Sequence, residues 1–206
     1  LLTLIPTAVF VEHALGDRVQ GNWPAVLYPT AAIAAAALVG RPWTRLRAPA
    51  VILGFIFTLG VYLQALAAPL ALPARLDPSL RALGGWGGLA AGVGKIGRVD
   101  GAAFLAAGNY GEASMLAFLG RGPVPVVATG ARWRLFRLSP AGPAIAGRSG
   151  LLLRRGGRAV PDPRHWVVLG PPTAMARTRH GEVARSYLLY RVRARSGIVG
   201  AILPEP

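Results

Sequence analysis

The chain has 206 residues, of which 53% are hydrophobic and only 15% are charged, and its formal net charge is +15. This composition is more apolar than that of an ordinary soluble domain, and it favours a membrane section followed by one small domain. The absence of cysteine excludes disulfides and cysteine-ligated metal sites.

The positive charge has two interpretations. An excess of arginine normally favours nucleic acid or an anionic membrane surface as the partner. However, Lys95 is the one lysine among the 23 basic residues, and the chain is rich in alanine, glycine and proline. A strong base-composition bias in the coding DNA would give the same pattern, so the charge alone does not identify a ligand.

The first 76 residues contain three uncharged runs. The chain opens inside the run 1–11, which we interpret as the end of a transmembrane helix, so we expect the chain to be the C-terminal part of a longer protein. The run 25–39 predicts a short membrane-spanning helix that is kinked at Pro29. The run 48–72 is 25 residues long and predicts a second full span.

The loops between these runs predict the orientation. The loop 40–47 contains three arginines, whereas the loop 12–24 has Arg18 set against two acidic residues. Because basic loops stay on the cytoplasmic side, we expect 40–47 to be cytoplasmic. The loop 12–24 and everything after Leu72 then lie on the outer side.

From Asp77 onward, short elements separated by glycine and proline predict a small α/β domain over residues 77–206. Its predicted helices are 110–119 and the one carrying Trp86, Leu89, Val93 and Ile96 at helical spacing. Residues 102–106 and 124–128 flank the helix 110–119 as parallel strands of a βαβ unit. Further strands are predicted at 133–138, 150–154, 166–169 and 185–194. In the last of these, Leu188, Tyr190 and Val192 should face one way and Leu189, Arg191 and Arg193 the other.

Motifs for chemistry are sparse in this domain. The three histidines form no H-E-x-x-H motif and there is no G-x-S-x-G motif, so hydrolase and metalloenzyme chemistry have little support and we expect no metal site. The segment 132–137, RWRLFR, could be a nucleic-acid face, but its near-alternation favours a strand with one solvated face. We therefore expect no nucleic-acid partner.

Asn109 and Tyr110 follow a predicted strand, at the end of a parallel sheet where ligands collect. They are the candidate crevice residues of the domain. A purely structural interpretation is stronger: Asn109 caps the next helix, and Glu112, three residues later, completes a capping box.

The loop before Pro29 also has two interpretations. Trp23 suits a bilayer interface and Asn22 the start of a helix, which explains both residues without a function. Alternatively, Arg18, Gln20 and Asn22 point into a cavity and hold an anionic head group, because arginine is a natural partner of phosphate.

The segments RVQGNWPAVLYP, GWGGLA and NYGEASMLAF occur in this order, with an arginine-rich loop and one long helix after the first. This arrangement resembles the end of bacterial membrane glycosyltransferases of the GT-C class. These enzymes use polyprenyl-phosphate sugars and are related to protein mannosyltransferases and to the lipid A aminoarabinose transferase.

The resemblance implies an integral enzyme of the bacterial inner membrane with a small α/β domain on the extracytoplasmic side. The enzyme would move a sugar from a polyprenyl-phosphate donor to a lipid, glycan or protein acceptor, with no cofactor besides the lipid-linked donor. It places the catalytic carboxylate upstream of this chain and matches Arg18, Gln20, Asn22 and Trp23 to a donor or substrate site. The alternative is a non-catalytic membrane-anchored module whose basic outer domain binds anionic lipid or polysaccharide.

Overall fold

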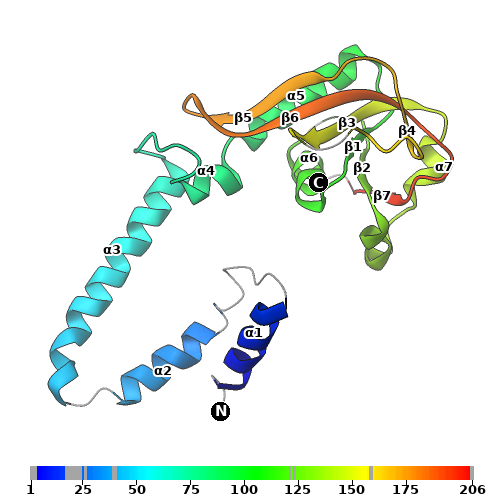
Figure 1. The fold of residues 1–206 in the computed structure, drawn as a ribbon. Coiled ribbons are helices and arrows are strands. Elements are labelled where there is room, and N and C mark those ends of the chain that lie inside the picture. The colour runs from blue at the N-terminus through cyan, green and yellow to red at the C-terminus, as the bar shows by residue number, and fades with distance from the viewer. Residues whose placement is uncertain are drawn as a thin grey trace. The chain divides into compact units, whose positions relative to one another are not determined.

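The computed structural model describes residues 4–16, 25, 27–38, 41–120, 122, 124–157 and 160–204 (Figure 1). The chain divides into two compact units, an N-terminal unit Leu1–Tyr62 and a C-terminal unit Leu63–Pro206. The architecture is mixed α/β, as predicted, with helices first and a curved mixed sheet after them.

The N-terminal unit contains α1 (Leu4–Gly16), α2 (Tyr28–Leu38), the 3₁₀-helix η2 (Arg41–Leu46) and most of α3 (Arg47–Leu66). Three predictions need correction here. The predicted loop from residue 12 is helical as far as Gly16, and the arginine loop 40–47 contains η2. Pro29 is the second residue of α2 and causes no kink, because the first N–H groups of a helix have no partner within the helix.

The α3 helix is the one described helix that is long and apolar enough to cross a membrane, over Thr44–Leu66. By contrast α2 has 11 residues and is about 16 Å long, shorter than the span predicted there. The α3 helix ends six residues before the predicted run does, because Ala68 has a φ of 46° and Pro69 follows it. Its large side chains are 50–72% exposed between Val51 and Leu63, so its apolar surface has no cover within the described chain.

The C-terminal unit contains five further helical elements and seven strands among the described residues. The helices are α4 (Pro78–Leu83), α5 (Trp86–Val99), α6 (Tyr110–Leu119), the 3₁₀-helix η3 (Ala131–Phe136) and α7 (Ala141–Ile145). The strands are β1 (Leu105–Ala107), β2 (Val126–Thr129), β3 (Ser149–Arg155), β4 (Trp166–Val168), β5 (Thr173–Arg179), β6 (Glu182–Ala194) and β7 (Gly200–Ile202).

The sheet has the order β4-β6-β3-β1-β2-β7, and β5 pairs with the first half of β6. The β1 strand is parallel to both of its neighbours, with Leu105 opposite Val126 on β2 and Leu151 on β3. The other pairs are antiparallel. The predicted parallel βαβ unit of β1, α6 and β2 is therefore confirmed.

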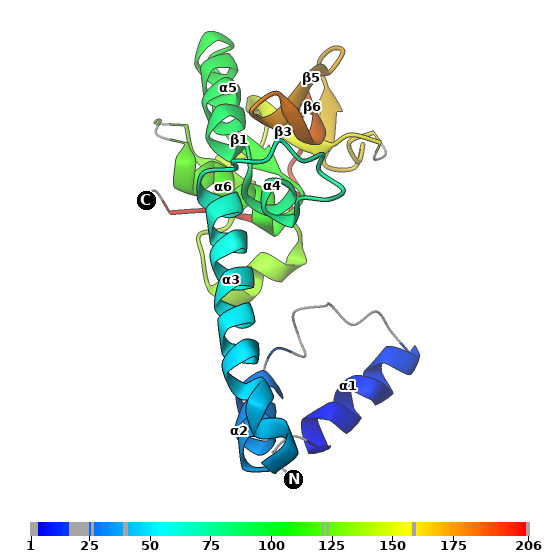
Figure 2. The same ribbon diagram turned by 90° about the vertical axis from the view of Figure 1, so that its left-hand side faces the viewer.

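Each face of the sheet packs against its own set of elements. On one face α5 and α6 cover β1, β2, β3 and β6 (Figures 1 and 2). On the other face α7 and Trp166 pack against the same strands. The long β6 strand confirms the predicted alternation: Leu189 belongs to the first core, whereas Tyr190 and Val192 belong to the second.

Three strand predictions were wrong or incomplete. Residues 133–138 are not a strand, because most of them belong to η3, where side chains three positions apart stack, as Trp133 and Phe136 do at 5.5 Å. The short or polar strands β5 and β7 were missed. The first parallel strand starts at Leu105 rather than at 102, although Ala103 N already donates to Ser149 O at 2.9 Å.

A buried carboxylate joins the first elements of the C-terminal unit. Asp77 is 2% exposed and is the N-cap of α4, where its Oδ1 accepts from Leu80 N at 2.9 Å and Ser79 Oγ at 2.6 Å. Its Oδ2 accepts from Gln64 Nε2 on α3 and from Arg179 Nη2 on β5, both at 2.8 Å. We call these five residues the Asp77 cluster.

The Asp77 cluster also fixes the end of α3. Arg179 Nη1 donates to Ala65 O at 3.2 Å, in the last turn of that helix. Burial alone would raise the pKa of Asp77, but the hydrogen bonds from Ser79, Gln64 and Leu80 and the charge of Arg179 together hold that pKa well below its ordinary value.

We predict that Asp77→Asn lowers the free energy of unfolding by about 2 kcal/mol at neutral pH, because an amide NH₂ would face the donors of Gln64 and Arg179. The folded-state pKa is lowered, so this stabilisation is complete above the unfolded pKa of about 3.9 and is lost as the pH falls below it. The difference between the two proteins should therefore shrink below about pH 4. Denaturant unfolding of the detergent-solubilised chain, followed by tryptophan fluorescence across this range, measures both effects.

The matched control is Asp162→Asn, which removes an exposed ion pair with Arg164 and should change the midpoint little. Equal effects of the two substitutions would contradict the role of Asp77.

Candidate functional site

The carboxyl ends of β1, β2 and β3 meet at one edge of the sheet. The chain leaves β1 through α6 toward β2, whereas it leaves β3 toward β4, which lies on the opposite side beyond β6. Neighbouring parallel strands whose chains depart in opposite directions leave a crevice between their carboxyl ends, where α/β proteins bind ligands. The candidate site is this edge between β1 and β3.

Asn109 and Tyr110 lie at this edge, where the sequence predicts them. Asn109 caps α6: its Oδ1 accepts from Gly111 N at 3.0 Å and from Glu112 N at 3.4 Å. The ring of Tyr110 is 58% exposed, and the guanidinium of Arg132 lies over it at 5.2 Å from the ring centre. The capping role is thus confirmed, while a ligand role for either residue stays a prediction.

Glu112 has a different role from the one predicted. Its carboxylate accepts a hydrogen bond from Arg155 Nε, at the end of β3, and does not close a capping box with Asn109 in the described contacts. The Glu112 side chain is 3% exposed and that of Arg155 is 30% exposed. This ion pair therefore joins α6 to the end of β3, next to the carboxyl end of β1, and leaves part of the arginine accessible.

A second cation lies under the same face of the sheet. Arg177 on β5 is 2% exposed, and its guanidinium lies 4.1 Å from the ring centre of Trp86. It donates to the carbonyls at the end of α4, at 2.7 Å to Arg81 O and 3.1 Å to Gly84 O. Burial lowers the pKa of Arg177 and raises that of Tyr187 beside it. These contacts make Arg177 a C-terminal cap and core residue rather than a ligand group.

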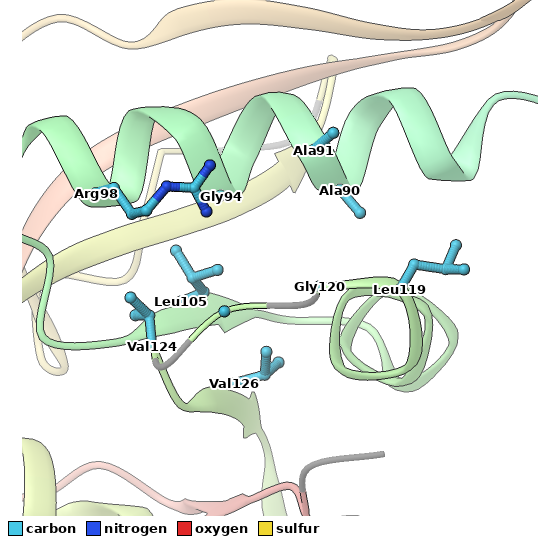
Figure 3. Close-up of a pocket in the computed structure, with 10 residues that line it drawn as sticks. Ala90, Ala91, Gly94, Arg98, Leu105, Leu119, Gly120, Val124 and Val126 are labelled. Atoms are coloured by element: carbon cyan, nitrogen blue, oxygen red, sulfur yellow. The ribbon is translucent and has the colours of Figure 1, made fainter.

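The opposite, amino-terminal edge of β1 and β2 contains a cavity of about 250 Å³ between α5 and α6. Figure 3 shows Leu105 and Val126 pointing toward α5, with Gly94 and the guanidinium of Arg98 at one end. Arg98 is exposed and has no ion pair in the described part of the chain. The walls offer almost no hydrogen-bonding side chains, so the cavity suits an apolar group better than a sugar.

The residues that the resemblance matches to a donor site lie outside the described part of the chain; they are Arg18, Gln20, Asn22 and Trp23. Within the described residues, no group of three or more His, Cys, Asp or Glu side chains is placed to hold a metal ion. Sequence reasoning did not single out Arg155, and it considered Arg132 only as part of the segment 132–137, without its contact with Tyr110. Their partners are 43 and 22 positions away, and no local spacing signals such a pair.

No protein-family model, curated protein or solved structure matches this chain.

We predict that Glu112→Gln lowers the free energy of unfolding by about 2 kcal/mol, because Arg155 loses its counter-charge in a largely buried setting. The double variant Glu112→Gln with Arg155→Met should recover part of the loss, since no charge is then left unpaired. Denaturant unfolding measures both. Glu182→Gln is the control, because Glu182 forms no ion pair within the described residues; a loss as large as that of Glu112→Gln would argue against a specific pair.

We predict that Gly94→Ala stabilises the chain by about 0.5–1 kcal/mol, because alanine is the better helix former. The added methyl would enter the cavity and meet only Arg98 Nη1, at 3.8 Å. Gly97→Ala on the same helix should give little or no gain, since its methyl would press on Leu105 Cδ2 at 3.2 Å. Thermal unfolding compares the two variants, and equal shifts in the midpoint would mean that the cavity is not open at Gly94.

Proposed function

We propose that this chain is the C-terminal part of an integral-membrane glycosyltransferase of the GT-C type, which uses a polyprenyl-phosphate sugar in a bacterial inner membrane. In this proposal α3 crosses the membrane, α1 and α2 belong to neighbouring membrane helices, and the C-terminal unit is an extracytoplasmic domain. The acceptor is a lipid, glycan or protein.

The observation that carries the proposal is the order of elements. One apolar helix of membrane-spanning length leads directly into a compact α/β domain. Of the two domain segments that resemble these enzymes, GWGGLA forms the start of α5 and NYGEASMLAF forms nearly all of α6 with its N-cap. Both helices cover the same face of the sheet, so the two segments build one structural layer.

The proposed chemistry is a displacement at the anomeric carbon of the sugar. The acceptor hydroxyl oxygen forms a bond to this carbon, the bond to the lipid phosphate breaks, and a carboxylate upstream of this chain takes the hydroxyl proton. Cations stabilise the charge that develops on the departing phosphate. We assign this role to Arg18, supported by Gln20, Asn22 and Trp23.

A second candidate function is a membrane-anchored module that binds anionic lipid or polysaccharide. The positive surface charge of the C-terminal unit favours this function. In the described part of this unit, the arginines that are paired with a carboxylate are Arg155, Arg164, Arg179 and Arg191. Several other arginines of this unit are exposed, among them Arg98, Arg137 and Arg148. Such a module would bind these polymers without transferring a sugar.

We predict that Arg18→Ala in the complete enzyme raises the KM for the donor or abolishes transfer, because the phosphate loses its bidentate partner. The measurement is transfer of radiolabelled sugar from polyprenyl-phosphate donors in membrane vesicles. Arg75→Ala is the matched control, because Arg75 is exposed and lies just beyond α3. Unchanged kinetics with normal expression would contradict the proposed role of Arg18. Polymer binding without any sugar transfer would favour the second candidate function.

A further inference from the structure

The outer surface of α6 and η3 exposes large apolar side chains in one place. Tyr110 and Phe118 on α6 are 58% and 68% exposed, and Leu135 and Phe136 on η3 are 79% and 60% exposed. We call these four residues the α6–η3 face. A compact domain normally buries such side chains, and a contiguous group of them marks a surface that contacts something apolar.

The spacing of the apolar residues along α6 and η3 creates this face. On α6, Tyr110, Ser114 and Phe118 are four positions apart and point outward, while Ala113 and Leu116 enter the core. On η3, Trp133 is buried and supports Phe136, whose ring lies 5.5 Å away. The exposed rings are therefore held by the packing and do not hang from a loose segment.

A groove of about 390 Å³ runs between the two elements. Ala117, Phe118, Phe136 and Leu138 line it, and Ser114 supplies the one side-chain hydroxyl among its lining residues. A groove with so few hydrogen-bonding groups does not select a polar ligand. It suits hydrocarbon.

Two arginines lie at the face, and neither forms an ion pair within the described residues. The guanidinium of Arg132 lies over Tyr110, and Arg137 follows η3 as an exposed residue. The acidic residue of α6, Glu112, points into the core and is paired with Arg155. The face thus combines aromatic rings, aliphatic groups and unneutralised arginine, the combination that occupies the interface of an anionic membrane.

We propose that the α6–η3 face lies in the interfacial layer of an anionic bilayer, with the rings among the upper acyl chains and Arg132 and Arg137 at the lipid phosphates. The last turn of α3 belongs to the C-terminal unit and is bonded to Asp77 and Arg179. A membrane-spanning α3 therefore keeps this unit at the bilayer surface. The inference rests on the membrane anchoring in the proposed function and is independent of sugar transfer.

The test uses the complete chain in vesicles, and the absence of cysteine allows single labels. Three variants, Leu135→Cys, Val99→Cys and Phe55→Cys, each carry an environment-sensitive fluorophore. Leu135 and Val99 are matched, at 79% and 78% exposed, and Val99 lies at the end of α5 away from the face. Phe55 lies in the middle of α3. The vesicles contain phosphatidylglycerol with lipids that carry a quencher on the acyl chain.

We expect the label at 135 to be blue-shifted and quenched several-fold more strongly than the label at 99. Arg132→Gln with Arg137→Gln, or about 1 M salt, where the screening length falls to about 3 Å, should remove most of that difference. Each arginine near the surface accounts for about a fivefold change in membrane partitioning.

Equal quenching at 135 and 99, with strong quenching at 55, would overturn the inference while leaving the membrane anchor intact. A label at 135 shielded from both the lipid quencher and an aqueous quencher would also overturn it, because a protein surface or a second copy would then cover the face. Absence of quenching at 55 would instead overturn the membrane anchor itself, and the inference with it.

Discussion

Asp77 is 2% exposed, and its carboxylate accepts hydrogen bonds from three different parts of the chain. A carboxylate can be buried at low cost only when its oxygens are fully bonded and a cation is close. Gln64 comes from the end of α3, Leu80 from α4, and Arg179 from β5, which follows 102 positions later. Removing the charge would weaken the contacts with Gln64 and Arg179 together, so Asp77 contributes directly to holding the last turn of α3 against β5.

A buried carboxylate is also paired with an arginine at the candidate site. Glu112 and Arg155 place a paired charge beside the carboxyl ends of β1 and β3, the edge where the chain leaves these strands in opposite directions. The arginine is the more exposed partner, so the exposed part of the pair is positively charged. The α6 helix serves both regions: its buried side carries Glu112, and its outer side carries Tyr110 and Phe118. A single helix therefore links the interior ion pair to an apolar, cationic surface.

The sequence predicts the elements whose signals are local. The α6 helix has the predicted bounds, because Asn109 caps it within three positions, and the β6 strand has clear alternation over Leu188, Tyr190 and Val192. The η3 helix was mistaken for a strand, because arginine and apolar residues alternate until the adjacent Leu135 and Phe136 break the pattern. The partnerships of Asp77 with Arg179 and of Glu112 with Arg155 could not be predicted. Their side chains meet only after β1, β3, β5 and β6 have paired.

The Asp77 cluster can be tested directly by a distance measurement in a bilayer. Spin labels at Leu66→Cys, at the end of α3, and Val183→Cys, on β6, are both on exposed positions, at 84% and 49%. If Asp77 fixes the last turn of α3 to the sheet, the wild-type background gives one narrow distance distribution and Asp77→Ala gives a broad one. A broad distribution in both proteins, or a narrow one in both, would contradict a central role for Asp77.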